Sequence, residues 1–420
     1  MSGPDLATLV PDHDRLERDL TELATYVDPD APGWTREVFS DPYRAARDWV
    51  RRQMVDAGLE TTVDAAGNVV GRLVGAGSGK PLVTGSHTDT VHGGGRFDGV
   101  VGVVGAIELV RRLRETGTEL THDLVVCDFL GEEANEFGLS CMGSRAIAGV
   151  LGAEHLDRRD GGGRRLGDAF ERFGTDPEGA LRLAWAPGSV HGYVELHVEQ
   201  GPLLERQGVP IGVVTAIAGI ERLLASFSGR ADHAGTMPMG ERRDALAAAA
   251  QAVLSVEREG CGAPVHGVAT TGRIESGPGA FNVVPDHARV WAEMRSIDAG
   301  WLSGAKGRIA EQIASDAAER GVEVVLEWLN DQAPVPTDPS IQDVIGAAAD
   351  DLGVPWSAVP SGAGHDAAHM AHLGPMGMIF VPSRDGRSHC PEEWTDLADL
   401  ATGVHALGAT LLRLDAWSPS

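Results

Sequence analysis

The chain has 420 residues, more than one hydrophobic core usually holds, so its length predicts two domains. It carries 35 Lys and Arg against 61 Asp and Glu, and the formal charge of −26 disfavours nucleic acids and anionic membranes as partners. The four cysteines form no CxxC pair, and no signal pattern or bilayer-length apolar run is present, so we expect a cytoplasmic protein with free thiols.

The first part of the chain alternates between helical and strand-like patterns. Leucines and alanines three or four residues apart predict helix between residues 12 and 57. Short apolar runs at 69–74 and 81–84 predict strands, followed by a helix at 102–113 and a buried strand at 123–130. This alternation predicts an α/β domain with a largely covered sheet.

The pattern changes near residue 214, where a second set of elements begins. In chain order it predicts strand, helix, strand, strand, helix and strand, which is the order of a split βαβ sandwich. These elements fall at residues 220–229, 241–258, 268–276, 287–296, 301–320 and 322–328. The α/β pattern then resumes, with a helix at 340–352, a strand at 376–381 and a helix at 395–412. We therefore predict one domain made of residues 1–214 and 333–420, interrupted by a small inserted domain at 215–332.

Residue types that bind metal follow or lie in several predicted strands. They are His87, Asp89 and Asp98 after the strand at 81–84, Glu132 and Glu133 after 123–130, His197 in the strand-like run 193–200, and His389 after 376–381. In an open α/β sheet the carboxyl ends of the strands gather at one edge, so these segments are expected to meet. Imidazole and carboxylate together suit zinc or a similar divalent ion, and a bridging carboxylate allows two ions.

The acidic residues of this set are expected to differ in role. Asp98 is the best bridging candidate, because glycines flank its approach and its carboxylate has two oxygens. Asp89 is better placed to hold the tautomer of His87 than to bind metal. Glu132 and Glu133 are adjacent and point in different directions, so one would bind an ion and the other would take a proton from water, as hydrolysis requires.

Simpler interpretations of the same residues remain open from the pattern alone. A histidine at a strand end is often a surface residue, a Glu-Glu pair is often a solvated helix start, and a GGG run is often a flexible loop. A phosphate-binding loop is poorly supported, because the chain has no GxxxxGK[ST] motif and no GxGxxG opening a helix.

Seven motifs occur in order between about residue 10 and residue 415. They are GSHTDTVHGGGRFDGVVGV, the Glu-Glu pair, YVELHVEQGPLLE, ADHAGTMPM, FNVVPD, SGAGHDA and MIFVPSRDGRSHCPEE. Jointly they resemble the hydantoinase/carbamoylase branch of the M20 metallopeptidase-like family, which includes N-carbamoyl-L-amino acid amidohydrolases, β-ureidopropionases and allantoate amidohydrolases. The resemblance implies a catalytic α/β domain with a mixed sheet, interrupted by a ferredoxin-like lid and dimerisation domain, and hence a homodimer.

The resemblance also implies the roles of the metal-binding residues. One ion would be held by His87, Asp98 and His197. A second ion would be held by Asp98, Glu133 and His389, so that Asp98 bridges the pair. Glu132 would then be the general base, and Asp89 would orient His87. The implied cofactors are two divalent ions per subunit, either zinc or one of manganese, cobalt and nickel.

The family's substrate-binding positions can be carried over in the same way. They fall here on Gln200, His233, Asn282, Arg295 and the backbone of Gly362 and Ala363. His233 is implied to stabilise the oxyanion, and the planar guanidinium of Arg295 to clamp the substrate carboxylate. Two positions depart from the family pattern: Glu136 stands where many members have Arg, and Met237 lies within HAGTMPM. A different acyl group or a changed salt bridge would each explain Glu136.

The implied activity is hydrolysis of a small molecule, an N-carbamoyl-L-amino acid or related ureido compound, to the amino acid, carbon dioxide and ammonia. An N-acyl amino acid hydrolase or a dipeptidase of the wider family is the alternative among enzymes. A binding protein that kept only the scaffold is a further alternative, and the presence of Glu132 beside the five implied ligands disfavours it.

Overall fold

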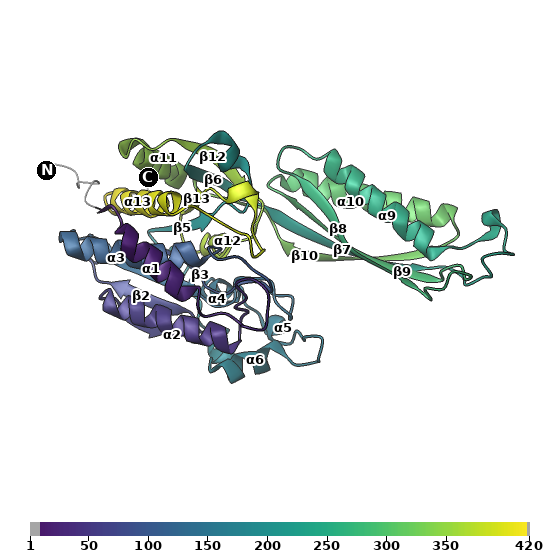
Figure 1. The fold of residues 1–420 in the computed structure, drawn as a ribbon, viewed down its shortest axis with the longest axis horizontal. Helices are drawn as coiled ribbons and strands as arrows, with labels where there is room; N and C mark the ends of the chain where they lie inside the picture. The colour runs from purple at the N-terminus through teal and green to yellow at the C-terminus, as the bar shows by residue number, and fades with distance from the viewer. Residues whose placement is uncertain (1–8, 418–420) are drawn as a thin grey trace. The chain divides into compact units, whose positions relative to one another are not determined.

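The computed structural model describes residues 9–417, which divide into two compact units (Figure 1). Of the described residues, 9–215, 337–359 and 365–417 form the first unit. The second is formed by Ala216–Pro336 and Pro360–Gly364. Among the helices of the described residues, none is long and apolar enough to cross a membrane.

The first unit is built on a mixed sheet in the order β1-β2-β4-β3-β5-β13-β6-β11, with β12 beside β6. Its strands are β1 (Glu60–Val63), β2 (Val69–Leu73), β3 (Leu82–His87), β4 (Leu124–Phe129), β5 (Gly192–Val198), β6 (Ile211–Ile217), β11 (Val335–Pro336), β12 (Trp356–Ser361) and β13 (Met376–Val381). The four central strands β4, β3, β5 and β13 are parallel. Antiparallel pairs flank them on both sides. The predicted α/β class and mixed sheet are therefore confirmed.

The long helices of the first unit share one core on one face of this sheet, and short helices lie on the other face. The long ones are α1 (His13–Leu23), α2 (Asp41–Asp56), α3 (Val100–Thr116), α11 (Pro339–Asp351) and α13 (Leu397–Asp415). Alternate residues of β5 face opposite ways, and Val194, Leu196 and Val198 join the core formed with α3 and α13. Glu195 and His197 therefore face the other side of the sheet, toward the short helix α12 (Ala367–Met370). The N–H of Ala367, the first residue of α12, donates to the Glu195 carboxylate.

Shorter helices complete the first unit. They are α4 (Met142–Ile147), α5 (Ala153–Leu156), α6 (Leu166–Phe173), α7 (Pro177–Ala180) and α8 (Leu203–Gln207). Several of these surround a separate apolar cluster that includes Tyr43, Phe137 and Phe170. This cluster supports the segment that follows Glu132 and Glu133.

The predicted helix between residues 12 and 57 is two helices rather than one, which corrects that expectation. α1 ends at Leu23, and α2 begins only after Ser40, whose side chain accepts from the N–H of Tyr43. Pro29 and Pro32 in between lack the N–H donors that a helix needs. The intervening segment instead places Arg36 in the interior, where its side chain donates to the Thr88 carbonyl at 2.6 Å.

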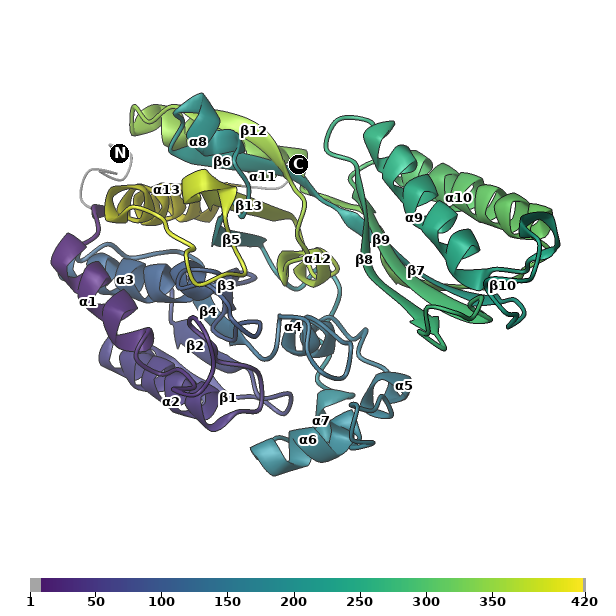
Figure 2. The same cartoon turned by 45° about the vertical axis from the view of Figure 1, so that its right-hand side comes forward.

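The second unit is a four-stranded antiparallel sheet in the order β10-β7-β9-β8. Its elements in chain order are β7 (Gly219–Ser228), α9 (Ala245–Cys261), β8 (Val268–Gly277), β9 (His287–Ser296), α10 (Ala299–Glu319) and β10 (Glu323–Gln332). Both helices lie on one face of the sheet (Figures 1 and 2). Small residues on α9, such as Ala248, Ala249 and Ala252, let that helix approach the strands closely.

Candidate metal centre

The predicted metal-binding residues of the first unit converge at one edge of its sheet. His87 is the last residue of β3, and His197 lies near the end of β5. Glu132 and Glu133 follow the end of β4, and His389 follows β13 across a loop. Because these four strands run parallel, their carboxyl ends share an edge, and the loops deliver the side chains to one place.

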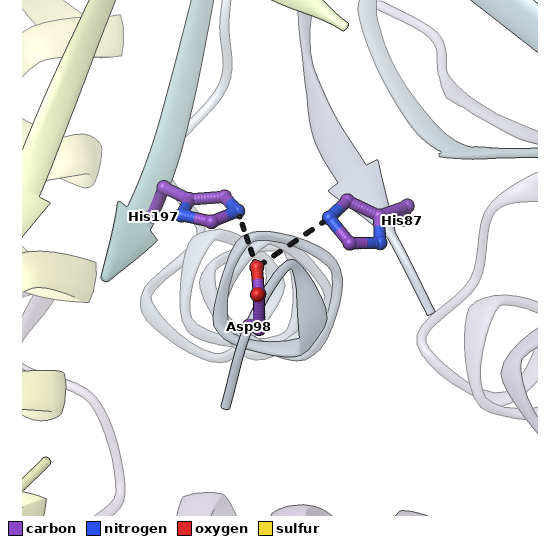
Figure 3. A group of neighbouring side chains, drawn as sticks. All are labelled: His87, Asp98 and His197. Carbon is purple, nitrogen blue, oxygen red and sulfur yellow. Dashed lines mark ion pairs between the residues drawn. The ribbon is translucent and has the colours of Figure 1, made fainter. Parts of the chain in front are cut away.

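One group of three side chains consists of His87, Asp98 and His197 (Figure 3). Their ligand atoms lie within 4.8 Å of one another, and all three residues are buried. Oδ1 of Asp98 is 3.2 Å from Nε2 of His197 and 3.7 Å from Nε2 of His87. Asp98 comes from the loop before α3, and the two histidines come from neighbouring strands.

A second group consists of Asp98, Glu133 and His389, again with ligand atoms within 4.8 Å of one another. Oδ2 of Asp98 is 3.1 Å from Nε2 of His389, which is 3.4 Å from Oε1 of Glu133. Asp98 thus turns one oxygen to each group. This is the arrangement that a carboxylate bridging two cations needs.

Glu132 lies between the first group and a thiol. Its Oε2 is 3.6 Å from Nε2 of His87, and its Oε1 accepts a hydrogen bond from Sγ of Cys141 at 3.4 Å. Burial raises the pKa of Glu132 well above its usual range. A carboxylate with a raised pKa is a suitable proton acceptor near neutral pH.

Asp89 contacts two parts of the site, the Glu132–Glu133 backbone and His87. Its two carboxylate oxygens accept from the N–H groups of Glu132 and Glu133, at 3.2 and 3.1 Å. Its backbone oxygen lies 3.1 Å from Nδ1 of His87, whereas its nearest carboxylate oxygen lies 3.6 Å away. Asp89 therefore fixes the Glu132–Glu133 segment with its side chain, and its carbonyl is the nearer partner of His87.

The side chains present fit a pair of divalent cations. Nδ1 of His87 and Nδ1 of His197 each face a backbone carbonyl, at 3.1 and 2.9 Å, which favours the tautomer whose Nε2 is unprotonated and can act as a ligand. In His197 this Nε2 accepts from the Gly99 N–H at 3.1 Å. Burial, together with the Asp98 carboxylate, raises the pKa of Glu133 to about 7. Three carboxylates in one buried site repel one another, and cations bound among them would relieve that repulsion.

Metal affinity is predicted to rise with pH. A hydrogen bond to Asp98 raises the pKa of His389 to about 9, so in the metal-free protein this imidazole is protonated below that value. An ion bound by the group Asp98, Glu133 and His389 must displace this proton, so the apparent affinity of that group should rise about tenfold per pH unit between roughly pH 7 and 9. Zinc calorimetry in buffers of different ionisation enthalpy would measure the released proton. An affinity that is constant across this range would contradict the prediction.

Gly99 is predicted to be required for the position of His87. It has φ +67°, and a Cβ there would overlap the His87 imidazole. Gly117, just after the other end of α3, has the same φ of +67°, but a Cβ there would meet nothing within 4 Å. Replacing either with alanine should lower the free energy of unfolding by about 1–2 kcal/mol. Only Gly99→Ala should also weaken zinc binding, and equal zinc affinities in the two variants would refute this role.

The predicted substrate residues of the second unit fall into two groups at opposite ends of its sheet. Arg295 donates to the carbonyl of Gly362 at 3.1 Å and to Glu293 at 2.6 Å. The backbone of Ala234, next to His233, donates to the Asn282 carbonyl at 2.9 Å. The Asn282 segment leads into β9 at His287, whereas Arg295 lies near the far end of that strand. The stretch of β9 between them spans about 26 Å.

The other predicted substrate residues have local partners. Ala363 is held by Ser361, whose Oγ accepts from the Ala363 N–H at 3.1 Å. Gln200, in the first unit, has φ +57°, and its Nε2 donates to Oδ2 of Asp98 at 2.8 Å. The same Nε2 is 3.3 Å from Nε2 of His389. Gln200 therefore contacts two of the predicted metal-binding residues, Asp98 and His389.

The departure at Glu136 coincides with a salt bridge. Glu136 forms a salt bridge with Arg164. Nε of Arg164 also lies 3.0 Å from Oδ2 of Asp160, and its Cζ lies 5.3 Å from the centre of the Phe137 ring. A positive charge thus lies beside position 136 although the residue itself is acidic. This favours the salt-bridge explanation of the departure. Nothing in the contacts of Met237 explains why it stands in the HAGTMPM motif.

Four residues near the site are not singled out by the sequence pattern: Cys141, Glu195, Ser388 and Glu393. Glu195 forms a further metal-competent group with His197 and His365. Its oxygens, however, already accept from Ser86, Tyr193 and the Ala367 N–H, at 2.8, 2.9 and 3.0 Å. We therefore interpret Glu195 as a structural support beneath the site. The sequence signals available were the motif YVELHVEQGPLLE, which contains Glu195, and the motif MIFVPSRDGRSHCPEE, which contains Ser388 and Glu393.

Comparison with known proteins defines the class of this one. The family model for Peptidase family M20/M25/M40 matches residues 79–413, and the chain belongs to this family. It is 39% identical over 402 residues to an N-carbamoyl-L-amino acid amidohydrolase of Geobacillus stearothermophilus, covering 96% of this chain and 98% of that one. It is 36% identical over 414 residues to a ureidoglycolate hydrolase of Oryza sativa subsp. japonica, covering 96% and 85%.

A solved structure gives the same result. The amidase of the hydantoinase/carbamoylase family from Burkholderia multivorans superimposes with a TM-score of 0.87 at 34% identity, covering 98% of this chain and 100% of that chain. The resemblance drawn from the motifs is therefore confirmed at the level of family and branch.

Proposed function

We propose that this protein is a metal-dependent amidohydrolase that cleaves the carbamoyl C–N bond of an N-carbamoyl-L-amino acid or a related ureido compound. The observation that carries the proposal is the buried Glu132 beside two metal-competent groups that share Asp98. The amidohydrolases among the relatives support the bond type. A protein that only binds its ligand would have no use for a proton acceptor at this place.

In this proposal His87, Asp98 and His197 hold one ion, and Asp98, Glu133 and His389 hold the other. When bound there, divalent ions would lower the pKa of a water molecule and polarise the carbonyl oxygen of the substrate. Zinc, manganese, cobalt and nickel all suit these ligands.

The chain's own residues handle the proton. Glu132 takes a proton from the attacking water and later gives it to the leaving amine nitrogen. One C–O bond forms and one C–N bond breaks, and the carbamic acid that is released decomposes to carbon dioxide and ammonia. The Asp89 carboxylate keeps Glu132 in place by accepting from the Glu132 N–H. The Cys141 thiol orients the Glu132 carboxylate by donating to its Oε1.

The substrate class is tested by a panel assayed on protein reconstituted with each of the four metals. The panel holds N-carbamoyl-L-amino acids, ureidoglycolate, allantoate, N-acetyl amino acids and dipeptides. Release of ammonia from a ureido compound supports the proposal. Cleavage of only acyl or dipeptide substrates favours the alternative of an N-acyl amino acid hydrolase or dipeptidase.

A homodimer is part of the proposal, with the inserted domain (residues 215–332) as both lid and dimer interface. The two ends of the second unit's sheet lie too far apart for Arg295 and the pair His233–Asn282 to contact one small substrate within a single protomer. We therefore propose that Arg295 acts in its own protomer, where it binds the substrate carboxylate. His233 and Asn282 would be supplied by the partner, with His233 donating to the developing oxyanion.

Mixed dimers test this arrangement. Arg295→Ala and His233→Ala protein are each expected to be nearly inactive. When equal amounts are dissociated and reassociated together, about half of the dimers should be mixed, and each mixed dimer has one intact site of two. About a quarter of the wild-type sites should therefore be regained. If all these residues acted within one protomer, no mixed dimer would have an intact site and activity would stay low.

A further inference from the structure

We infer that Glu393 is a positioning residue that fixes the position of the Asp98 carboxylate, the proposed bridge, relative to His389. The inference rests on the metal site proposed above. Glu393 lies in the loop between β13 and α13 and is only 2% exposed. Neither composition nor strand position marked it, and no step of the proposed reaction uses it.

One oxygen of Glu393 fixes the backbone at Asp98. Oε1 accepts from the N–H of Phe97 at 2.7 Å and from the N–H of Asp98 at 3.0 Å. Two hydrogen bonds from consecutive amides to one carboxylate oxygen set the direction in which the chain enters α3. They therefore set where the Asp98 carboxylate lies. Gly95 permits this approach, because a Cβ there would overlap the Glu393 carboxylate.

The other oxygen fixes the segment that carries His389. Oε2 accepts from Oγ of Ser388 at 2.5 Å, and the same Oγ lies 3.2 Å from Oδ2 of Asp98. A hydroxyl has one proton, so Ser388 can donate to only one of these carboxylates at a time. The shorter contact is with Glu393. One buried side chain thus joins residues 97–98 to residue 388, beside the ligand of the second ion.

The negative charge of Glu393 is also expected to favour metal binding. The backbone amides and the hydroxyl that it contacts are neutral donors, so its charge adds to the negative potential around Asp98. That potential favours bound cations. The loss of Glu393 should therefore weaken metal binding through both geometry and charge.

The experiment compares zinc binding by full-length protein that has been stripped with a chelator, using a chromophoric zinc competitor. Glu393→Ala should lower zinc affinity about 10–100-fold. Glu393→Gln should lower it less, because its amide oxygen can still accept from Phe97 and Asp98. Glu392→Ala is the matched control, because Glu392 is exposed and pairs with Arg387 at 2.9 Å; it should bind zinc as the wild type does.

Chemical unfolding of the metal-free variants separates positioning from a merely structural role. A Glu393→Ala protein that is less stable yet binds zinc as tightly as the wild type would overturn the inference. If that variant does not fold, Glu393→Gln and Ser388→Ala decide by the same measurement, and wild-type affinity in both would overturn it. If the wild type itself bound no zinc, cobalt, manganese or nickel, the proposed metal site would fail, and this inference with it.

Discussion

Replacing Glu132 with glutamine is expected to lower kcat by about 10²–10⁴-fold while both metal sites stay occupied. Glutamine has nearly the same shape, but its amide cannot take a proton from water at neutral pH. Glu132 belongs to neither three-residue metal group, so its loss should leave the ligands in place. Steady-state kinetics with the best ureido substrate, together with the metal content of the purified variant, would measure both effects.

Glu136→Gln is the matched control for this substitution. Glu136 lies four residues further along and is largely exposed, with Arg164 as its partner. Its replacement should change kcat less than about twofold, as expected for a surface substitution. A Glu132→Gln enzyme with near-normal kcat would show that the proton acceptor is another group.

Asp98→Asn is expected to remove both ions, whereas His389→Ala is expected to remove one. Each oxygen of Asp98 faces a different metal-competent group, but His389 belongs to only one of them. Both variants should fall to background activity if both ions are needed. Metal analysis after dialysis against a weak chelator would count the ions that remain per chain.

His92→Ala provides the comparison for these variants, since His92 is an exposed histidine of the same loop as Asp98 and lies 3.8 Å from Glu37. It should keep the metal content and activity of the wild type. If Asp98→Asn and His389→Ala lost the same single ion, Asp98 would not be a bridge.

The sequence predicts most of the fold, and its failures have physical causes. Strong periodicity and apolar runs located the long helices and the central strands of both units. The prediction between residues 12 and 57 missed a break, because apolar residues continue through the segment between α1 and α2, where Pro29 and Pro32 lack the N–H donors of a helix. Short strands such as β1 and β12 carry too few apolar residues to be distinguished from loops.

The metal-competent residues were predictable because parallel strands end at one edge, so that a residue's place after a strand also gives its place in space. Contacts between distant segments do not follow that rule. The bonds from Glu393 to the Asp98 segment join residues 295 positions apart, and nothing in the spacing of the sequence indicates them. The separation of Arg295 from His233 was likewise invisible until the register of β9 was known.

We propose above all that hydrolysis by this protein requires cations bound by the two groups of side chains that share Asp98. The most direct measurement is a zinc or manganese titration of metal-free protein, with ammonia release from an N-carbamoyl-L-amino acid or ureidoglycolate followed at each step. We predict no turnover without metal, and activity that rises and then saturates near two equivalents per chain. Full turnover by the metal-free protein, or saturation with no hydrolysis of any ureido compound, would contradict this proposal.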